Sequence, residues 1–178
     1  MRNVKREFQL FTVMQWKEEQ EFLRWEHKNG WKFTRRGNFG RYSFEKCKPE
    51  DVVYQIDYNP KGIANKEEYV QMFSDCGWEY LQDYNGYSYF RKPVSKMNGD
   101  EEIFCDDASR MDLIKRVFRG KVCPSILLFF GCVLPQLFLQ VLRENKILLG
   151  FYIVSTVIYL ILFLHIAIQY WKYKKSLK

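Results

Sequence analysis

Two long apolar runs decide the fold of this chain: residues 122–142 read VCPSILLFFGCVLPQLFLQVL, and residues 147–169 read ILLGFYIVSTVIYLILFLHIAIQ. Neither run contains Asp, Glu, Lys or Arg, and only the sequence RENK separates them. At about 1.5 Å per residue, each run forms a helix roughly 30 Å long, which matches the hydrocarbon core of a bilayer. The remaining residues are too few to bury two such helices inside a soluble globule. We therefore predict a transmembrane helical hairpin.

Basic residues at the two outer ends of the hairpin predict its orientation, because Lys and Arg concentrate on the cytoplasmic side of a membrane. The residues that we expect to face lipid headgroups are Arg110, Lys115, Arg116 and Arg119 before the first span, and Lys172, Lys174 and Lys175 in a basic tail at residues 170–178. The turn between the spans contains only two basic residues, Arg143 and Lys146. Both termini are therefore predicted to be cytoplasmic.

The net charge of the chain is +7, and it is unevenly distributed. Residues 105–178 carry 11 Lys and Arg against 4 Asp and Glu, whereas residues 1–104 carry 17 of each sign. The basic excess thus lies beside the membrane, where anionic lipid headgroups attract it. The neutral N-terminal part lacks the basic surface that nucleic acid requires, so we expect no nucleic-acid partner.

Polar residues within the spans are candidates for contacts inside the membrane. Gln136 and Gln140 lie one turn apart in the first span, just after Pro135, which should kink that helix. Either glutamine could bond to Ser155, Thr156 or His165 of the second span, or to a partner helix. The alternative role, in a transport path, requires oligomerisation or another protein, because two helices cannot enclose a path.

The N-terminal part contains a weak internal repeat with an offset of 47 residues. Glu21-Phe22-Leu23 followed by Gly30-Trp31 recurs as Glu68-Tyr69-Val70 followed by Gly77-Trp78. Hydrophobic periodicity predicts a strand, a helix and two strands in each half. The first half (1–47) has strands at 5–14, 31–35 and 40–46 around a helix at 17–28. The second (50–93) has strands at 52–58, 78–84 and 87–92 around a helix at 65–76.

This pattern predicts an α+β fold: a duplicated β-α-β-β domain at residues 1–93, with both helices on one face of an antiparallel sheet. Asn65 and Glu68 have the spacing of a capping box, and Asn85-Gly86 predicts a tight hairpin turn. A polar linker follows at residues 94–106. Residues 107–121 predict a basic amphipathic helix, which either lies at the headgroup boundary or extends the first span.

Few residues suggest catalysis. The chain has only two histidines, and His27 lies in the last turn of a predicted helix, where the helix dipole favours a cation. The same dipole explains Glu18-Glu19 at the start of that helix. The five cysteines show no Cys-x-x-Cys spacing and no Cys/His cluster. We therefore expect no enzyme activity, no metal site and no cofactor.

Aromatic residues of the predicted strands and helix ends provide one candidate binding surface, made of Trp31, Tyr42, Tyr54, Asp57, Trp78 and Tyr89. We expect most of these rings to form the core. A cup between the two halves could instead bind a small apolar or cationic molecule. Asp57 interrupts an aromatic strand and is interpreted as a polar edge residue, with a buried acid as the alternative.

The order of these motifs resembles a known family. The motifs are Lys17-Glu18-Glu19, Gly30-Trp31, Tyr42-Ser43-Phe44-Glu45, Tyr54-Gln55-Ile56-Asp57-Tyr58, Glu67-Glu68-Tyr69, Phe73, Gly77-Trp78-Glu79 and Tyr89-Phe90-Arg91-Lys92. Over residues 5–120 they resemble the bacterial domain of unknown function 2812. The resemblance implies a protein of Firmicutes type in the bacterial cell membrane, often encoded beside PadR-type transcriptional regulators. It implies no known activity, and the doubled unit is also similar to the gyrase-inhibitor-like fold.

Three functions remain open at this point. The first is a non-enzymatic, membrane-anchored cytoplasmic module that senses a signal or binds a partner protein, in a stress or drug response under a PadR-type regulator. The second is a small-molecule sensor that uses the aromatic cup. The third is an accessory subunit of a transporter or other membrane complex, which binds through its first span.

Overall fold

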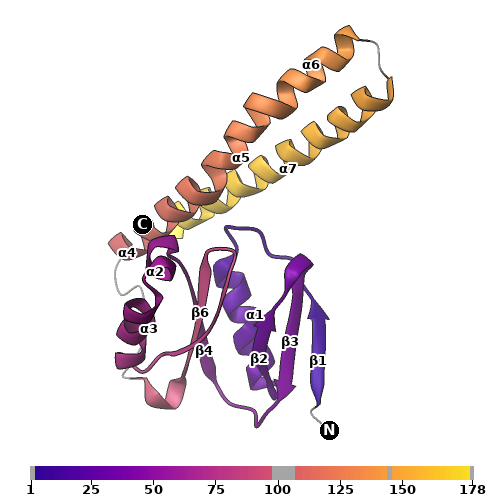
Figure 1. Ribbon diagram of the computed structural model, residues 1–178. Coiled ribbons are helices and arrows are strands. Elements are labelled where there is room, and N and C mark those ends of the chain that lie inside the picture. Colours follow the sequence, from indigo (N-terminus) through magenta and orange to yellow (C-terminus); the bar gives the residue numbers. More distant parts are fainter. Residues whose placement is uncertain (1–2, 98–106, 144–145, 177–178) are drawn as a thin grey trace. The chain divides into compact units, whose positions relative to one another are not determined.

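The computed structural model describes residues 3–97, 107–143 and 146–176, apart from the side chains of residues 107–110 and 176 (Figure 1). It divides into two compact units, Met1–Leu113 and Ile114–Lys178. The first unit contains all the strands, and the second contains most of the two long apolar helices. This is the mixed α+β architecture predicted from the sequence.

The first half of the N-terminal unit is a three-stranded antiparallel sheet with one helix. It runs β1 (Val4–Phe8), α1 (Trp16–Lys28), β2 (Trp31–Arg36), a single 3-10 turn η1 (Asn38–Gly40) and β3 (Arg41–Lys46). The strand order is β1-β3-β2, so the last strand lies in the middle.

The second half repeats this topology. It consists of β4 (Val52–Tyr58), α2 (Pro60–Ala64), α3 (Lys66–Asp75), β5 (Glu79–Tyr84) and β6 (Tyr87–Pro93), with strand order β4-β6-β5. A short 3-10 turn η2 (Val94–Lys96) follows β6. Each sheet has an irregularity in its register, between Phe33 and Arg35 in β2 and between Tyr80 and Gln82 in β5. These irregularities are also 47 residues apart, so the duplication extends to the backbone.

The described strands form two sheets, and the main helices α1 and α3 contact these sheets differently. Helix α1 contacts β2 and β4 and therefore touches strands of both halves, whereas α3 contacts β5 within its own half. The structure thus differs from the expectation of two helices on one face of one sheet, because α1 contacts strands of both halves and α3 packs against its own half. Helix α3 contributes Tyr69 and Phe73 to a core cluster with Trp78 and Phe90.

One local prediction about a helix end was wrong. Asn65 precedes α3, but its side chain makes no capping hydrogen bond, so the predicted capping box does not form. Instead Asn59 caps the unpredicted helix α2, where its side chain accepts a hydrogen bond from the backbone N–H of Gly62 at 3.0 Å. Pro60 follows as the first helical residue, a position that suits proline because its missing N–H is not needed there.

The predicted hairpin turn is confirmed, and glycines also follow both main helices. Gly30 and Gly77 follow α1 and α3 with φ of +84° and +79°. Asn85 and Gly86 join β5 to β6, both with positive φ, as a two-residue hairpin turn requires. Strand β1, in contrast, ends at Phe8 rather than continuing to residue 14.

The C-terminal unit is a pair of long helices. The first is continuous through α4 (Asp107–Val117), η3 (Phe118–Val122), α5 (Cys123–Leu128), η4 (Phe129–Val133) and α6 (Leu134–Leu142), and the second is α7 (Lys146–Ser176). Within these, Met111–Leu142 and Lys146–Lys175 are long and apolar enough to cross a membrane. The helices contact each other through the ring of Phe129, whose centroid lies 5.3 Å from that of Tyr159 and 5.5 Å from that of Phe163.

The first helix is continuous, so residues 107–121 are helical where the structure describes them and join the first apolar run without a break. The segments η3 and η4 are π-helical turns, and each ends two residues before a proline, Pro124 and Pro135. A proline cannot donate a backbone hydrogen bond, and its ring crowds the carbonyl four residues earlier. The wider turn accommodates this defect without ending the helix.

Candidate functional site

Five of the six residues in the predicted binding surface lie in the interior of the N-terminal unit. Tyr42, Tyr54, Asp57, Trp78 and Tyr89 are all at most 5% exposed. Trp31 is half-buried, and the Lys5 ammonium lies 5.7 Å from the centre of its ring. These side chains therefore form no open surface.

The rings from the two halves contact one another directly. Phe33 of β2 lies at the centre, with its ring centroid 5.7 Å from Tyr89 and 6.3 Å from Tyr54 of the second half. Phe33 is itself 1% exposed. The interface between the halves, for which a cup was the alternative to a filled core, is thus occupied by the protein's own rings.

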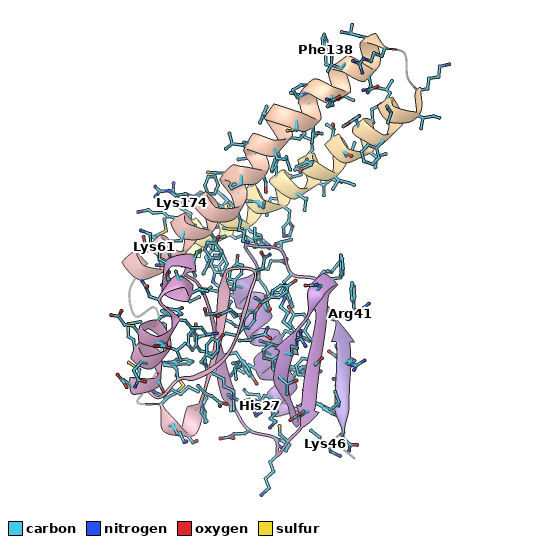
Figure 2. The ribbon with its side chains drawn as sticks, in the orientation of Figure 1. His27, Arg41, Lys46, Lys61, Phe138 and Lys174 are labelled. Atoms are coloured by element: carbon cyan, nitrogen blue, oxygen red, sulfur yellow. The ribbon has the colours of Figure 1, made fainter. Side chains whose placement is uncertain are left out.

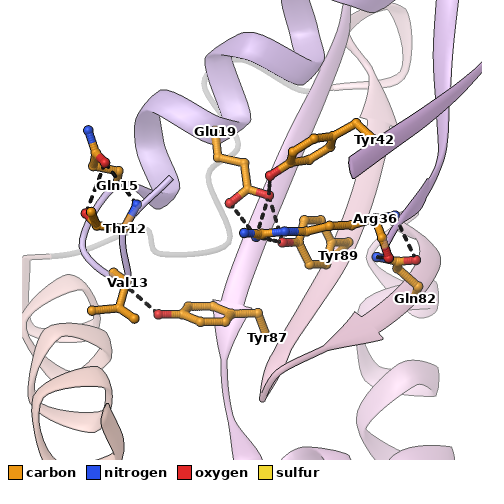
Figure 3. A network of polar contacts seen from close by, with 9 residues as sticks. All are labelled: Thr12, Val13, Gln15, Glu19, Arg36, Tyr42, Gln82, Tyr87 and Tyr89. Carbon is orange, nitrogen blue, oxygen red and sulfur yellow. Dashed lines mark hydrogen bonds and ion pairs between the residues drawn. The ribbon is translucent and has the colours of Figure 1, made fainter. Parts of the chain in front are cut away.

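A buried carboxylate connects the elements around this interface (Figure 3). Glu19 of α1 is 3% exposed, and its Oε1 accepts hydrogen bonds from the hydroxyls of Tyr42 and Tyr89, both at 2.7 Å. The Nη1 of Arg36 lies 2.8 Å from both carboxylate oxygens and also donates to the Tyr89 hydroxyl. The network joins α1, β2 and β3 of the first half to β6 of the second.

Arg36 is held on several sides. Its guanidinium lies 4.7 Å from the ring centre of Tyr84 and 5.4 Å from that of Tyr42. Its backbone N–H donates to the side-chain oxygen of Gln82 at 3.2 Å, which bridges β2 and β5. Since β2 and β5 are edge strands of separate sheets, this side-chain contact takes the place of a backbone ladder between them.

Burial controls the protonation of this network. Burial raises the pKa of the Glu19 carboxyl, while the charge of Arg36 and the two tyrosine hydroxyls oppose that rise. Burial, together with the neighbouring Glu19 carboxylate, raises the pKa of Tyr42 and of Tyr89. Both phenols therefore stay protonated and donate hydrogen bonds. Within this network of Glu19, Tyr42, Tyr89 and Arg36, the positive charge comes from Arg36.

Two further polar residues differ from their predicted roles. Asp57 is a buried acid, 3% exposed, that accepts a hydrogen bond from the Tyr69 hydroxyl at 2.8 Å; the edge-residue interpretation was wrong. His27 is 6% exposed, and its Nδ1 lies 2.8 Å from the Tyr54 hydroxyl. Burial, aided by the charge of Arg91, lowers the pKa of His27. The histidine therefore favours the neutral form, in contrast to the predicted cation at the helix end.

An ion pair at the surface also joins the halves. Arg24 of α1 donates two hydrogen bonds to the Asp51 carboxylate, at 2.6 and 2.8 Å, and the ammonium of Lys28 lies 3.0 Å from the same group. The hydrogen bonds from Arg24 lower the pKa of Asp51 to about 2, with smaller contributions from Lys28. The carboxylate is about one-third exposed, so solvent screens this pair more than the Glu19 network.

In the C-terminal unit, the two predicted glutamines lie in different environments. Gln140 is buried, whereas Gln136 is exposed. Ser155 and Thr156 each bond to the carbonyl four residues earlier in their own helix, at 2.9 and 2.8 Å. The predicted bonds from the glutamines to these hydroxyls are thus absent from the described residues.

His165 and the basic ends complete the predicted sites of this unit. His165 is half-buried, and its Nε2 is buried without a hydrogen bond to a described residue. The basic residues predicted to face lipid headgroups are mostly exposed, namely Lys115, Arg119, Lys172, Lys174 and Lys175. Arg116 is half-buried, and the side chain of Arg110 lies outside the described residues.

An exposed apolar corner of the first sheet was missed by sequence analysis. It consists of Phe8, Leu10 and Phe39, which are 64%, 67% and 81% exposed. The backbone N–H of Gln9 donates to the carbonyl of Gly40 at 2.8 Å, which brings the end of β1 beside the turn that carries Phe39.

The backbone of Phe39, in this apolar corner, has an unfavourable conformation. Its φ is +56°, a left-handed conformation that is rare for a bulky residue and costs on the order of 1–3 kcal/mol. The sequence signal was an aromatic residue between glycines, Gly37-Asn38-Phe39-Gly40, in a turn that otherwise needs only small polar residues.

No metal-binding site is evident among the described residues. Among the described residues, no three His, Cys, Asp or Glu side chains are grouped closely enough to bind a metal ion. Cys47, Cys76, Cys123 and Cys132 are free thiols, and Cys105 lies outside the described part of the chain.

The structure therefore defines a class of protein: a duplicated β-α-β-β domain with an aromatic core, followed by two helices of membrane-spanning length. The family model described as "Protein of unknown function (DUF2812)" matches residues 15–128, and the chain belongs to this family. The match begins at α1 and extends into the first long helix, so it includes part of the predicted membrane segment. No curated protein and no solved structure matches the chain.

Proposed function

We propose that this protein is a non-enzymatic interaction module that the helical hairpin anchors to the cytoplasmic face of the cell membrane. The observation that carries the proposal is the exposure of apolar side chains along both long helices, of which Leu127, Phe151 and Leu164 are each more than 60% exposed. Exposed apolar surface on this scale requires lipid or another protein to cover it.

The basic residues give this anchor its direction. Lys115 and Arg119 precede the first span, and Lys172, Lys174 and Lys175 follow the second. With the N- and C-terminal ends both basic, the positive-inside rule favours a cytoplasmic domain and a cytoplasmic tail, and anionic headgroups are the expected lipid partners.

The apolar corner is the surface that supports binding to a partner protein. Phe8, Leu10 and Phe39 project from one end of the first sheet, where no core requires them, and one of them is held in an unfavourable backbone conformation. Strained, exposed apolar residues are typical of binding surfaces. The direct contacts among the buried rings give no comparable support to an aromatic cup for a small molecule.

The anchor is tested by fractionation of cells that express the full chain. We expect the protein in the membrane pellet, and we expect it to stay there after extraction with alkaline carbonate, which removes peripheral proteins. Release of the full chain by carbonate would contradict the anchor.

The interaction surface is tested by affinity purification of the full chain in mild detergent, followed by mass spectrometry. A variant with Phe8→Thr, Leu10→Ser and Phe39→Asn should lose a stoichiometric partner. The matched control is Met72→Ser, because Met72 is also exposed but lies on α3, away from the apolar corner. Equal recovery of the partner with both variants would exclude the apolar corner as its binding site.

A further inference from the structure

Gln136 presents a polar amide on the outer surface of a predicted membrane span. Its side chain is exposed, and no hydrogen bond joins it to a described residue. Arg143, at the end of the helix, is seven residues away, so Gln136 lies roughly 10 Å along the helix from that end. Its short side chain does not reach the membrane surface from this depth. If the hairpin spans the membrane, as proposed above, the amide faces hydrocarbon.

Gln136 is exposed at the edge of the surface that contacts α7, because Gln140, one turn further along α6, is buried. The side chains of Phe129 and Gln140 are buried on the inner side of the hairpin. Cys132, four residues before Gln136 and therefore on about the same side of the helix, is exposed. Leu139, three residues after it, is also exposed. We call Cys132, Gln136 and Leu139 the outer face of the first span.

An amide on this outer face needs a partner that both donates and accepts hydrogen bonds. A polar group without a partner is costly in hydrocarbon, and interhelical hydrogen bonds of glutamine drive the association of membrane helices. The glutamine side chain carries a carbonyl acceptor and an NH₂ donor, so two glutamines satisfy each other.

We propose that the outer face binds a second copy of this chain, with Gln136 of each copy bonded to Gln136 of the other. Two copies in one membrane have the same orientation, so their Gln136 side chains lie at the same depth. A two-fold axis perpendicular to the membrane then pairs them without any other polar residue. A different protein would need its own donor and acceptor at that depth.

Cys132 provides a built-in reporter of this contact. In a full-length variant that retains Cys132, with Ser at positions 47, 76, 105 and 123, copper-phenanthroline treatment of membranes should form a disulfide-linked dimer. The further change Gln136→Leu should lower the dimer yield by about three- to thirtyfold, the range that corresponds to one interhelical hydrogen bond. Gln136→Asn keeps the amide and should restore most of the cross-link.

The matched control moves the thiol to the other side of the same helix. Phe138 is exposed on α6 (Figure 2). Its position two residues from Gln136 places it on a different side of the helix. Cys132→Ser combined with Phe138→Cys should give little dimer. Equal cross-linking from both positions would indicate random collision and would overturn the proposal.

Two other outcomes would also overturn it. One is no dimer from a protein that resists alkaline carbonate, which removes the self-association but leaves the membrane anchor intact. The other is cross-linking of Cys132 to a different protein, which would assign the outer face to a partner helix of a membrane complex. Release by carbonate would instead remove the membrane anchor on which this inference rests.

Discussion

At the scale of single residues, the Glu19 network is the most demanding feature of the domain. It encloses a carboxylate and a guanidinium that are both largely removed from water, and each is balanced by the other. Buried ion pairs add little net stability when complete, but removal of one partner leaves an uncompensated charge. The network therefore contributes more to the specificity of the fold than to its stability, because it forms only when α1, β2, β3 and β6 meet in one arrangement.

Glu19→Leu should lower the free energy of unfolding by about 3–5 kcal/mol, because it leaves the charge of Arg36 buried without its carboxylate. The measurement is chemical denaturation followed by tryptophan fluorescence. Glu21→Leu, an exposed position on the same helix, is the control and should change the stability by less than about 0.5 kcal/mol. Adding Arg36→Met to Glu19→Leu should recover part of the loss, and no recovery would mean that the buried charge is not its cause.

The pKa of Asp51 predicts one contribution to stability in acid. Its value in the folded protein, about 2, lies below the ordinary 3.8, so the folded state favours the carboxylate. The contribution is complete above the ordinary pKa and is lost as the pH falls from about 4 to 2. Because solvent screens the pair, we expect about 0.5–1 kcal/mol.

Asp51→Asn should remove this contribution. The variant should be slightly less stable than the natural chain at pH 6 and equally stable at pH 2, as measured by thermal unfolding across that range. Glu50→Gln, an exposed neighbour that forms no ion pair with a described residue, is the control. A constant difference between the variant and the natural chain at every pH would show that Asp51 acts by packing and not by charge.

The sequence indicated which residues are aromatic core but not which polar residues are buried with them. The helix dipole explained Glu18 and Glu19 equally well, and only Glu19 lies on the side of α1 that holds Leu23 and Glu26. The partner Arg36 is 17 residues away and on another element. Pairing of this kind depends on tertiary structure, so neither local composition nor spacing reveals it. For the same reason, His27 and Asp57 were assigned to positions more exposed than those they occupy.

At the scale of elements, the duplication is more complete than the short sequence repeat. Each half has the same strand order, a register irregularity at the corresponding position and a glycine with positive φ after its main helix. These features were predictable where a residue type has a single local cause, as glycine has after a helix. Helix α2 was not predicted because a five-residue helix has too few turns to show hydrophobic periodicity.

Gly30→Ala should destabilise the domain by about 1–2 kcal/mol, because alanine is strained at a φ of +84° and its Cβ would lie 3.1 Å from the Cys47 carbonyl oxygen. The measurement is the midpoint of urea denaturation. Gly37→Ala is the matched control, since Gly37 has a φ of −103° and no neighbour closer than 3.7 Å. Equal effects of both substitutions would mean that conformation is not what requires Gly30.

At the scale of the whole molecule, the two long apolar helices were the most predictable part of the chain. The length of an uncharged run and the charges at its ends are properties of single residues added along the sequence. The environment of Gln136 and Gln140 was not predictable, because both lie one turn apart in α6 and only tertiary contacts decide which of them is buried. An ideal helix places these glutamines on one side, whereas the structure exposes one and buries the other.

Truncation after Met97 should give a soluble, folded protein, because both sheets and their core residues precede this position. Near-ultraviolet circular dichroism should show fixed aromatic rings, and size-exclusion chromatography should show a monomer if self-association depends on Gln136. An aggregated or unfolded product would indicate that the N-terminal unit depends on the helices that follow it.

The strand order has a consequence for the order of events during synthesis. In each sheet the last strand to be made, β3 or β6, occupies the middle, and the two earlier strands do not pair with each other. Neither β1 nor β2 can therefore form a ladder until the ribosome has released β3. The adjacent hairpin of β2 and β3 should close first, within microseconds, and β1 should then add to it across a longer loop. Neither sheet can thus assemble before its central strand has been made, and the two long apolar helices are synthesised after both central strands.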